Sequence, residues 1–196
     1  MEIFRTVKVN QNEIQIGDKL DIYLTNLQNF KATVHKITEE WVPANNTYRK
    51  YATCMFDDCI AEHSMNITST NLGGYEMSDL NNWLKETIFP LFPTELKDIM
   101  GCLTLPSYGM IFGHDDWYKR TLESDNDEQF VLMKKRLNKT ADFYDEESFY
   151  WLRNATLSLF DVKSFAGVTS EGKPSVFPAQ YYFGVRPVFT FALTKE

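Results

Sequence analysis

The sequence is short of the features that mark several large protein classes. It has only three cysteines, Cys54, Cys59 and Cys102, and no two of them form a Cys-x-x-Cys pair. An odd count without that spacing argues against a disulfide framework, so we expect reduced, buried thiols. No apolar run reaches the roughly 18 residues of a membrane-spanning helix, which predicts no membrane insertion. Residues 1–5 also lack the apolar centre of a classical signal peptide, which predicts a protein that is cytoplasmic or virion-associated, or that leaves the cell by another route.

Positive charge is scarce as well. The chain has 20 Lys and Arg against 27 Asp and Glu, a net charge of −7, and its one basic cluster, residues 134–136, follows an acidic stretch. A nucleic-acid-binding surface needs a basic stripe, so we expect no nucleic-acid partner. His63 and His114 stand near acidic residues, but neither shows a zinc spacing or a calcium-loop pattern. The sequence therefore predicts no metal and no other cofactor.

The chain is well supplied with apolar and aromatic residues. Hydrophobic residues make up 43% and aromatic residues 15% of its 196 residues, enough for one large domain or two small ones. We favour a single domain, 1–196, with N-terminal strands in 1–60, a helical middle in 76–137 and a C-terminal strand module in 149–193. Strands that flank a helical region, without βαβ alternation, predict the α+β class.

Alternation of apolar and polar residues predicts the N-terminal strands at 3–9, 20–24, 30–37 and 51–56. Pro43 and the asparagines after it predict a loop at 41–46. A helix is expected to begin after Ser78 as N-cap and to end at Pro90. A second short helix should follow Thr94, and the spacing of Phe130, Met133 and Leu137 favours a third after an acidic cap at 125–128. The inward face of the first helix should carry Leu80, Trp83, Leu84 and Ile88.

The C-terminal quarter shows the strongest pattern. From Phe183 to Leu193 every second residue is apolar, which predicts one strand whose apolar face lies on the core and whose other face carries Arg186. Pro187 cannot donate to a ladder, so the strand should be bulged there or lie at a sheet edge.

An arginine stands in each outer run of this quarter, Arg153 and Arg186. Either side chain can bind an anion or act as an internal clamp that ties loops to the sheet. We favour the clamp, because buried charges are usually satisfied by carboxylates or carbonyls. The candidate acids for Arg186 are Glu76 and Asp79, which follow closely after the Gly73-Gly74 loop.

Two aromatic loops are the candidate ligand contacts. One contains Trp117 and Tyr118, and the other runs from Lys173 through Gln180 to Tyr181 and Tyr182. Aromatic rings beside Asp, Asn and Gln suit stacking on sugars or contacts with a protein partner. The alternative is that Tyr181 and Tyr182 simply pack their own loop.

Several segments together resemble an uncharacterised family of phages, prophages and Gram-positive gut bacteria. They are Ile16-Gly17-Asp18, Gly73-Gly74-Tyr75, Ser78-Asp79-Leu80, Trp83-Leu84, Leu105-Pro106-Ser107, Ile111-Phe112-Gly113, Trp151-Leu152-Arg153-Asn154, Phe165-Ala166 with Val168, and Gly184-Val185-Arg186-Pro187-Val188. The last modules look like the end of the C-type-lectin-like fold of sulfatase-modifying-factor and phage tropism-determinant proteins. The resemblance implies small antiparallel sheets with two or three helices. Structural roles are then expected for Trp83, Trp151, Arg153, Gly184 and Arg186.

The function that the resemblance implies is non-catalytic recognition of a glycan or a protein, in a cytoplasmic or virion-associated protein. One alternative is an enzyme of the formylglycine-generating type, but such enzymes use a late cysteine pair and no cysteine follows Cys102. A nucleophile motif such as Gly-x-Ser-x-Gly is also missing, and closeness in sequence does not make Cys54 and His63 a pair. A structural virion or assembly protein is the other alternative. We expect a binding protein rather than an enzyme.

Overall fold

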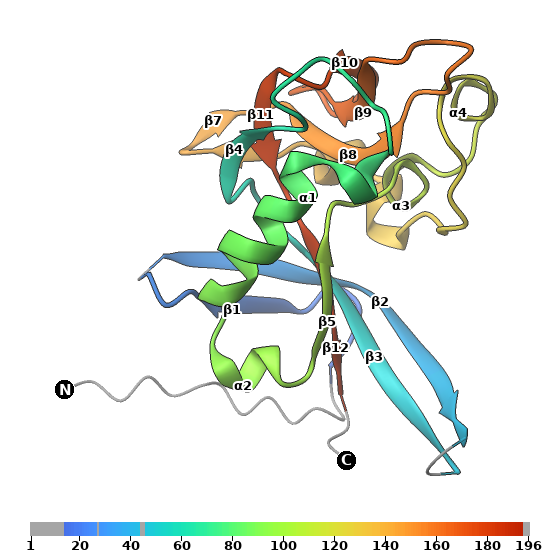
Figure 1. Ribbon diagram of the computed structural model, residues 1–196. Helices are drawn as coiled ribbons and strands as arrows, with labels where there is room; N and C mark the ends of the chain where they lie inside the picture. Colours follow the sequence, from blue (N-terminus) through green and yellow to red (C-terminus); the bar gives the residue numbers. More distant parts are fainter. Residues whose placement is uncertain (1–13, 27, 44–45, 194–196) are drawn as a thin grey trace.

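Two five-stranded β-sheets form the frame of the molecule, one above the other in Figure 1. The computed structural model describes residues 14–26, 28–43 and 46–193. The strand expected at 3–9 lies outside these residues. Helical segments flank the sheets, and the arrangement confirms the α+β class with mostly antiparallel strands.

The lower sheet unites the N-terminal strands with the end of the chain. Its order is β1 (Lys19–Tyr23), β2 (Asn29–Val42), β3 (Thr47–Phe56), β12 (Val188–Ala192) and β5 (Met100–Thr104), all antiparallel. The expected strands at 20–24, 30–37 and 51–56 are confirmed. The predicted loop at 41–46 begins too early, because Trp41 still belongs to β2. Trp41 pairs with Tyr48 of β3, and the centroids of their rings lie 5.0 Å apart. Cross-strand aromatic packing extends the hairpin beyond what local composition suggested.

The upper sheet is built mainly from the C-terminal quarter. Its order is β10 (Pro174–Pro178), β9 (Ser164–Val168), β8 (Tyr150–Ala155), β11 (Tyr182–Val185) and β4 (Ala61–Ser64). Neighbours are antiparallel except β8 and β11, which are parallel. A separate two-stranded ribbon consists of β6 (Asp142–Phe143) and β7 (Glu146–Glu147).

The run from Phe183 to Leu193 is not one strand, as its alternation predicted, but two. β11 ends at Val185 in the upper sheet, and β12 begins at Val188 in the lower sheet. The break falls at Pro187, which has no amide hydrogen to give a ladder. β12 lies between β3 and β5, so of the two alternatives predicted for Pro187, a bulge or a sheet edge, the edge is wrong, and the strand is interrupted there instead. The segment is buried on both faces, and Arg186 is only 4% exposed.

The helical middle is shorter and more broken than predicted. In order it holds η3 (Tyr75–Met77), α1 (Asp79–Trp83), the π-helical turn η4 (Leu84–Ile88), η5 (Phe89–Leu91), α2 (Thr94–Lys97), α3 (Tyr108–Phe112), α4 (Asp116–Thr121), η6 (Val131–Lys134) and η7 (Arg136–Lys139). The cap at Ser78 is confirmed, since its Oγ accepts from the amide of Asn81 at 3.1 Å. The strand β5 interrupts this region, which was not expected, and four short α-helices replace the expected two or three in the part of the chain that the structure describes.

The third predicted helix is wrong. Residues 131–139 form two 3-10 turns, because Lys135 between them is extended. Phe130 and Met133 are buried as expected, but Leu137 is 83% exposed. A 3.6-residue period over three apolar residues did not distinguish a helix from two separate turns.

One hydrophobic core cluster joins the two sheets, with Val34 and Phe189 from the lower sheet and Trp151 and Val185 from the upper. A second cluster packs α3, α4 and the 3-10 turns on the upper sheet. The expectation of buried thiols holds for two of the cysteines, while the third, Cys102 in β5, is exposed. Within the described residues, no helix is long and apolar enough to cross a membrane.

Gly184 gives a direct test of the packing between β11 and its neighbours. A Cβ at this position would lie 2.3 Å from Cys59 Sγ and 2.9 Å from the carbonyl oxygen of Phe149. We expect Gly184→Ala to lower the free energy of unfolding by about 1–3 kcal/mol through overpacking. Urea unfolding measures the change, and adding Cys59→Ala should restore part of it, because the two positions then couple. An unchanged midpoint in Gly184→Ala would contradict this packing.

Candidate functional site

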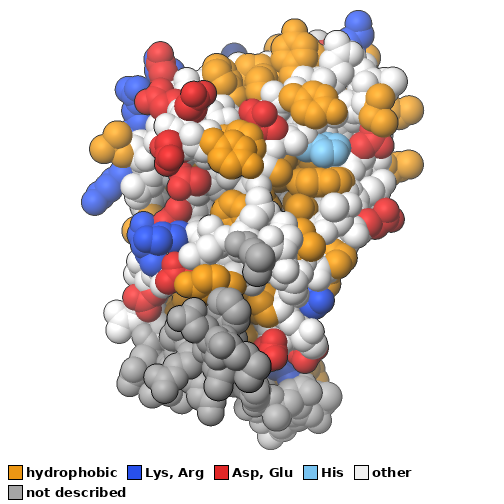
Figure 2. Space-filling view, turned by 90° about the vertical axis from the view of Figure 1, so that its left-hand side faces the viewer, with side chains coloured by type: hydrophobic (Ala, Val, Ile, Leu, Met, Phe, Trp, Pro, Cys, Tyr) orange, Lys and Arg blue, Asp and Glu red, His pale blue; other side chains and the backbone are white. Residues whose placement is uncertain are grey.

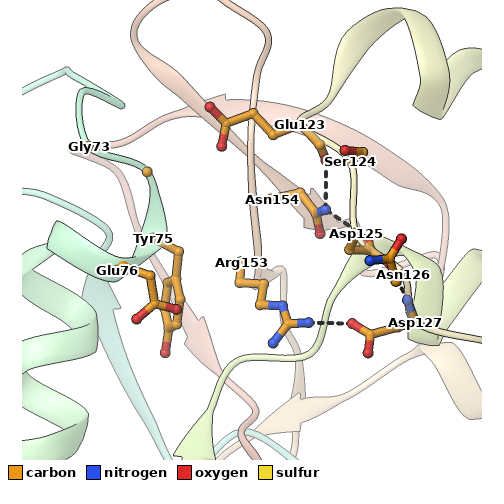
Figure 3. Close-up of a pocket in the computed structure, with 11 residues that line it drawn as sticks. Gly73, Tyr75, Glu76, Glu123, Ser124, Asp125, Asn126, Asp127, Arg153 and Asn154 are labelled. Carbon is orange, nitrogen blue, oxygen red and sulfur yellow. Dashed lines mark hydrogen bonds and ion pairs between the residues drawn. The ribbon is translucent and has the colours of Figure 1, made fainter.

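A polar pocket opens where three segments of the chain meet beside the upper sheet (Figure 3). Residues 73–76 form one wall, residues 123–127 form another, and Arg153 and Asn154 come from β8. The pocket has a volume of about 520 Å³. We call it the Arg153 pocket. Of its residues, the sequence singled out two for their chemistry: Arg153 as a clamp or anion-binding side chain, and Glu76 as a candidate acid for Arg186.

Asp125 holds the second wall in place. Its carboxylate accepts hydrogen bonds from Asn154 Nδ2 at 2.8 Å, the amide of Asp127 at 2.9 Å and the amide of Gly109 at 3.2 Å, and it pairs with His114 Nε2 at 3.0 Å. Burial by itself raises the pKa of Asp125, but the bonds from His114 and Asn154 outweigh it and hold the pKa below its ordinary value. The acidic run at 125–128 is therefore a loop wall and not the helix cap that was predicted.

The first wall is held with similar firmness. Gly73 and Gly74 have φ of 82° and 63°, a conformation that side-chain-bearing residues rarely adopt. The hydroxyl of the next residue, Tyr75, accepts from the amide of Leu105 at 3.1 Å. Burial raises the pKa of Tyr75 to about 12, so the phenol stays protonated at neutral pH. The wall therefore presents fixed groups to the pocket.

The two arginines have different surroundings. Arg186 acts as an internal clamp: its guanidinium donates to the carbonyls of Phe56 at 2.9 Å and Asn138 at 3.3 Å, and to the hydroxyl of Tyr150 at 3.3 Å. Arg153 forms an ion pair with Asp127, and its side chain remains 29% exposed in the pocket.

The acids expected to pair with Arg186 are elsewhere. The Glu76 carboxylate lies 3.9 Å from Lys85 Nζ, and the Asp79 carboxylate accepts from the amide of Ile67 at 2.8 Å. The prediction of backbone carbonyl partners for Arg186 is confirmed, and the prediction of Glu76 and Asp79 is wrong. Asp79 is used locally, near the start of α1, and Glu76 makes only a long contact there.

A second candidate site is a row of rings across the edge of the upper sheet. His63 on β4 stacks on Trp83 of α1, with centroids 4.8 Å apart and planes at 27°, and lies 6.2 Å from the ring of Tyr182 on β11. We call Trp83, His63 and Tyr182 the aromatic row. Figure 2 shows a histidine flanked by hydrophobic side chains on this face. The row includes one predicted ligand contact, Tyr182, which is 68% exposed.

The neighbouring Tyr181 is also exposed, and its ring stands edge-on to Phe183 at 6.0 Å. Gln180 is exposed beside it. The single loop predicted at 173–182 is wrong, because β10 occupies residues 174–178 and separates Gln180 from Lys173, which pairs with Glu171 at 2.5 Å. The side chains of Tyr181 and Tyr182 therefore reach the surface, and each ring also packs on a neighbouring ring, of Phe183 and His63 respectively.

The other predicted aromatic loop is a helix and lies elsewhere. Asp115 caps α4, which carries Trp117 and Tyr118 on the side of the upper sheet away from β4 (Figure 1). Tyr118 is only 4% exposed, and its hydroxyl bonds to the backbone of Asp125. Trp117 is at the surface and packs on Tyr108 at 5.4 Å. The structure does not bring these two residues to the aromatic row.

Thiol chemistry finds little support in the geometry. Cys54 lies in β3 of the lower sheet, and His63 lies in β4 of the upper sheet. Burial raises the pKa of Cys54 and of Cys59 to about 12, so both stay protonated at neutral pH. No group of His, Cys, Asp and Glu suited to a metal ion occurs among residues 14–26, 28–43 and 46–193.

The sequence contained weak signals for both sites. The Gly73-Gly74 pair and the acidic run at 125–128 marked the two walls, but nothing local indicated that they face Arg153. Trp83 and His63 stand 20 residues apart, and only the packing of α1 on β4 joins their rings. Such pairings depend on tertiary contacts.

Comparison with known proteins adds no relative to this description. No protein-family model, no curated protein and no solved structure matches the chain. The resemblance to the phage-associated family with a C-type-lectin-like module therefore stays a prediction.

Proposed function

We propose that this chain is a non-catalytic recognition module that binds a glycan at the aromatic row. The observation that carries the proposal is the alignment of Trp83, His63 and Tyr182 on one face, with Tyr181 beside them. Three different elements, α1, β4 and β11, supply the three rings, so the row is held by the fold. A rigid scaffold limits the entropy lost on binding.

Stacked aromatic rings suit the apolar face of a sugar. The C–H groups of a pyranose ring carry partial positive charge, which is attracted to the negative face of an aromatic ring. The hydroxyls of Tyr181 and Tyr182 can donate and accept hydrogen bonds at the same time, as sugar hydroxyls require. A row of rings therefore offers both stacking and polar contacts.

His63 adds a polar atom of defined character. Its Nδ1 lies 2.6 Å from the carbonyl oxygen of Ser64, so in the neutral ring Nδ1 carries the proton. Nε2 is then an acceptor that can receive a hydrogen bond from a ligand hydroxyl. This polar atom in the middle of the row favours a hydroxyl-rich ligand over a purely apolar one.

The test is a glycan array with the wild-type protein, followed by calorimetric titration of the best ligand. We expect the double variant Tyr181→Ala/Tyr182→Ala to bind at least roughly tenfold more weakly, because truncation of exposed aromatic anchors typically costs more than 1 kcal/mol. Tyr48→Ala is the matched control, since Tyr48 is exposed on β3 in the other sheet and should leave affinity unchanged.

Equal affinity of the double variant and wild type would refute the aromatic row as the site. A silent array together with capture of a specific protein would instead favour the protein-ligand alternative. A silent array with measurable turnover would overturn the non-catalytic assignment.

A further inference from the structure

Arg153 has hydrogen-bonding capacity that the chain itself does not use. A guanidinium carries five N–H donors, and the one side-chain partner of Arg153 among the described residues is Asp127. Its side chain enters the pocket between the two walls (Figure 3). A partly exposed guanidinium with free donors suits a planar acceptor that takes two hydrogen bonds, above all a carboxylate.

Two carboxylates on the other side of this space also have unused capacity. Within the described residues, the Glu123 side chain has no hydrogen-bond or ion-pair partner, and it reaches towards Gly74, where an added Cβ would lie 3.4 Å from Glu123 Oε2. Glu76 has only long contacts, with Lys85 at 3.9 Å and Asn81 at 3.5 Å. Asp125 and Asp127, in contrast, are paired with His114 and Arg153. The pocket therefore has an excess of negative charge opposite its one guanidinium.

The two ends of the pocket select against ligands with a single charge. A simple anion that reaches Arg153 also meets the repulsion of Asp127, Glu76 and Glu123, and a simple cation near those acids leaves the unused donors of Arg153 without an acceptor. A molecule with both charges, placed in the right order, satisfies both ends. The walls are already held by Asp125 and Tyr75, so little ordering is needed on binding.

We propose that the Arg153 pocket binds a small zwitterion, with its carboxylate on Arg153 and its ammonium group between Glu76 and Glu123. This site shares no residue with the aromatic row and does not depend on the glycan proposal. The ligand class is an amino acid whose ammonium group need not be on the α-carbon. The distance between its ammonium and carboxylate groups should decide how tightly it binds.

A series of ω-amino acids tests the proposal with the full chain. Glycine, β-alanine, γ-aminobutyrate and ε-aminocaproate are titrated and followed by NMR amide shifts, beside butyrate and butylamine as single-charge controls. We expect one member of the series to bind roughly tenfold more tightly than either control, with shifts at residues 73–76 and 123–127. Failure of every member to exceed the controls would overturn the proposal.

Variants then separate the two ends of the pocket. Glu123→Gln keeps the shape of an exposed side chain and should weaken zwitterion binding several-fold, whereas Glu146→Gln, on the exposed strand β7, should not. Arg153→Gln should abolish the preference for the zwitterion over butylamine. Unchanged binding by Glu123→Gln would refute the ammonium site. Tyr181→Ala/Tyr182→Ala should bind the zwitterion normally, so the two proposals fail independently.

Discussion

Trp151→Ala is expected to lower the free energy of unfolding by about 3–5 kcal/mol, because it removes a fully buried indole from the centre of the upper sheet. The ring lies 5.0 Å from Phe183 and 6.3 Å from Phe177, so its loss leaves a cavity lined by rigid aromatic rings. Its Nε1–H donates to the carbonyl of His63 at 2.9 Å. Truncation therefore leaves that carbonyl unpaired as well.

Urea unfolding measures the effect. It is followed by far-UV circular dichroism, because the variants change the tryptophan fluorescence itself. Trp151→Phe should fall between alanine and wild type, because it keeps most of the ring volume and loses only the hydrogen bond and part of the packing. Trp41→Ala is the matched control: Trp41 is half-exposed at the end of the β2–β3 hairpin, and we expect less than about 1 kcal/mol there. A similar loss in both alanine variants would contradict the central role of Trp151.

Arg186→Ala is expected to cost about 2–4 kcal/mol of unfolding free energy. The guanidinium is buried at the break between β11 and β12 and satisfies two carbonyls, of Phe56 and Asn138, and the hydroxyl of Tyr150. Its removal leaves these acceptors without a donor in the interior. Burial, and then the charge of Arg186 nearby, lower the pKa of the neighbouring His35 to about 4, so His35 is neutral at neutral pH and adds no second positive charge beside the guanidinium.

Arg186→Lys should recover little of this loss, because one ammonium group cannot reach acceptors that lie in different directions around a planar fork. Thermal and urea unfolding of both variants beside wild type give the comparison. Arg120→Ala removes an exposed arginine on α4 and should change the midpoint by less than about 0.5 kcal/mol. Midpoints equal to wild type in both Arg186 variants would show that the guanidinium is not a clamp.

Part of the fold followed from local pattern alone. Alternation of apolar residues identified β1, the first part of β2 and the second half of β3, because a strand with one buried face must repeat every two residues. The N-cap at Ser78 was correct for the same kind of reason, because a cap acts on the nearest few backbone groups. The predicted stop at Pro90 was wrong: α1 ends at Trp83, and the helical turns after it continue through Pro90 to Leu91. Proline fits the first positions of a 3-10 turn, where its missing amide hydrogen is not needed.

Predictions from apolar periodicity failed where tertiary packing or a local break in the backbone decided the structure. Residues 183–193 alternate like one strand, yet the chain leaves one sheet for another at Pro187. Tyr118 reads as a loop aromatic but is buried, because Asp115 starts a helix that turns it inward. Leu137 fits a helical face and is exposed, because an extended Lys135 separates two turns.

The sequence by itself determined the α+β class and most strand positions, and it singled out Arg153, Arg186 and Tyr182 as candidates. Only the tertiary structure decided which of these residues meet: Arg186 with carbonyls from β3 and the η7 turn, Arg153 with Asp127, and Tyr182 with His63. The physical reason is that periodicity encodes whether a side chain is buried, which is a local property. The partner of a buried or stacked side chain is set by how sheets and helices pack across many intervening residues.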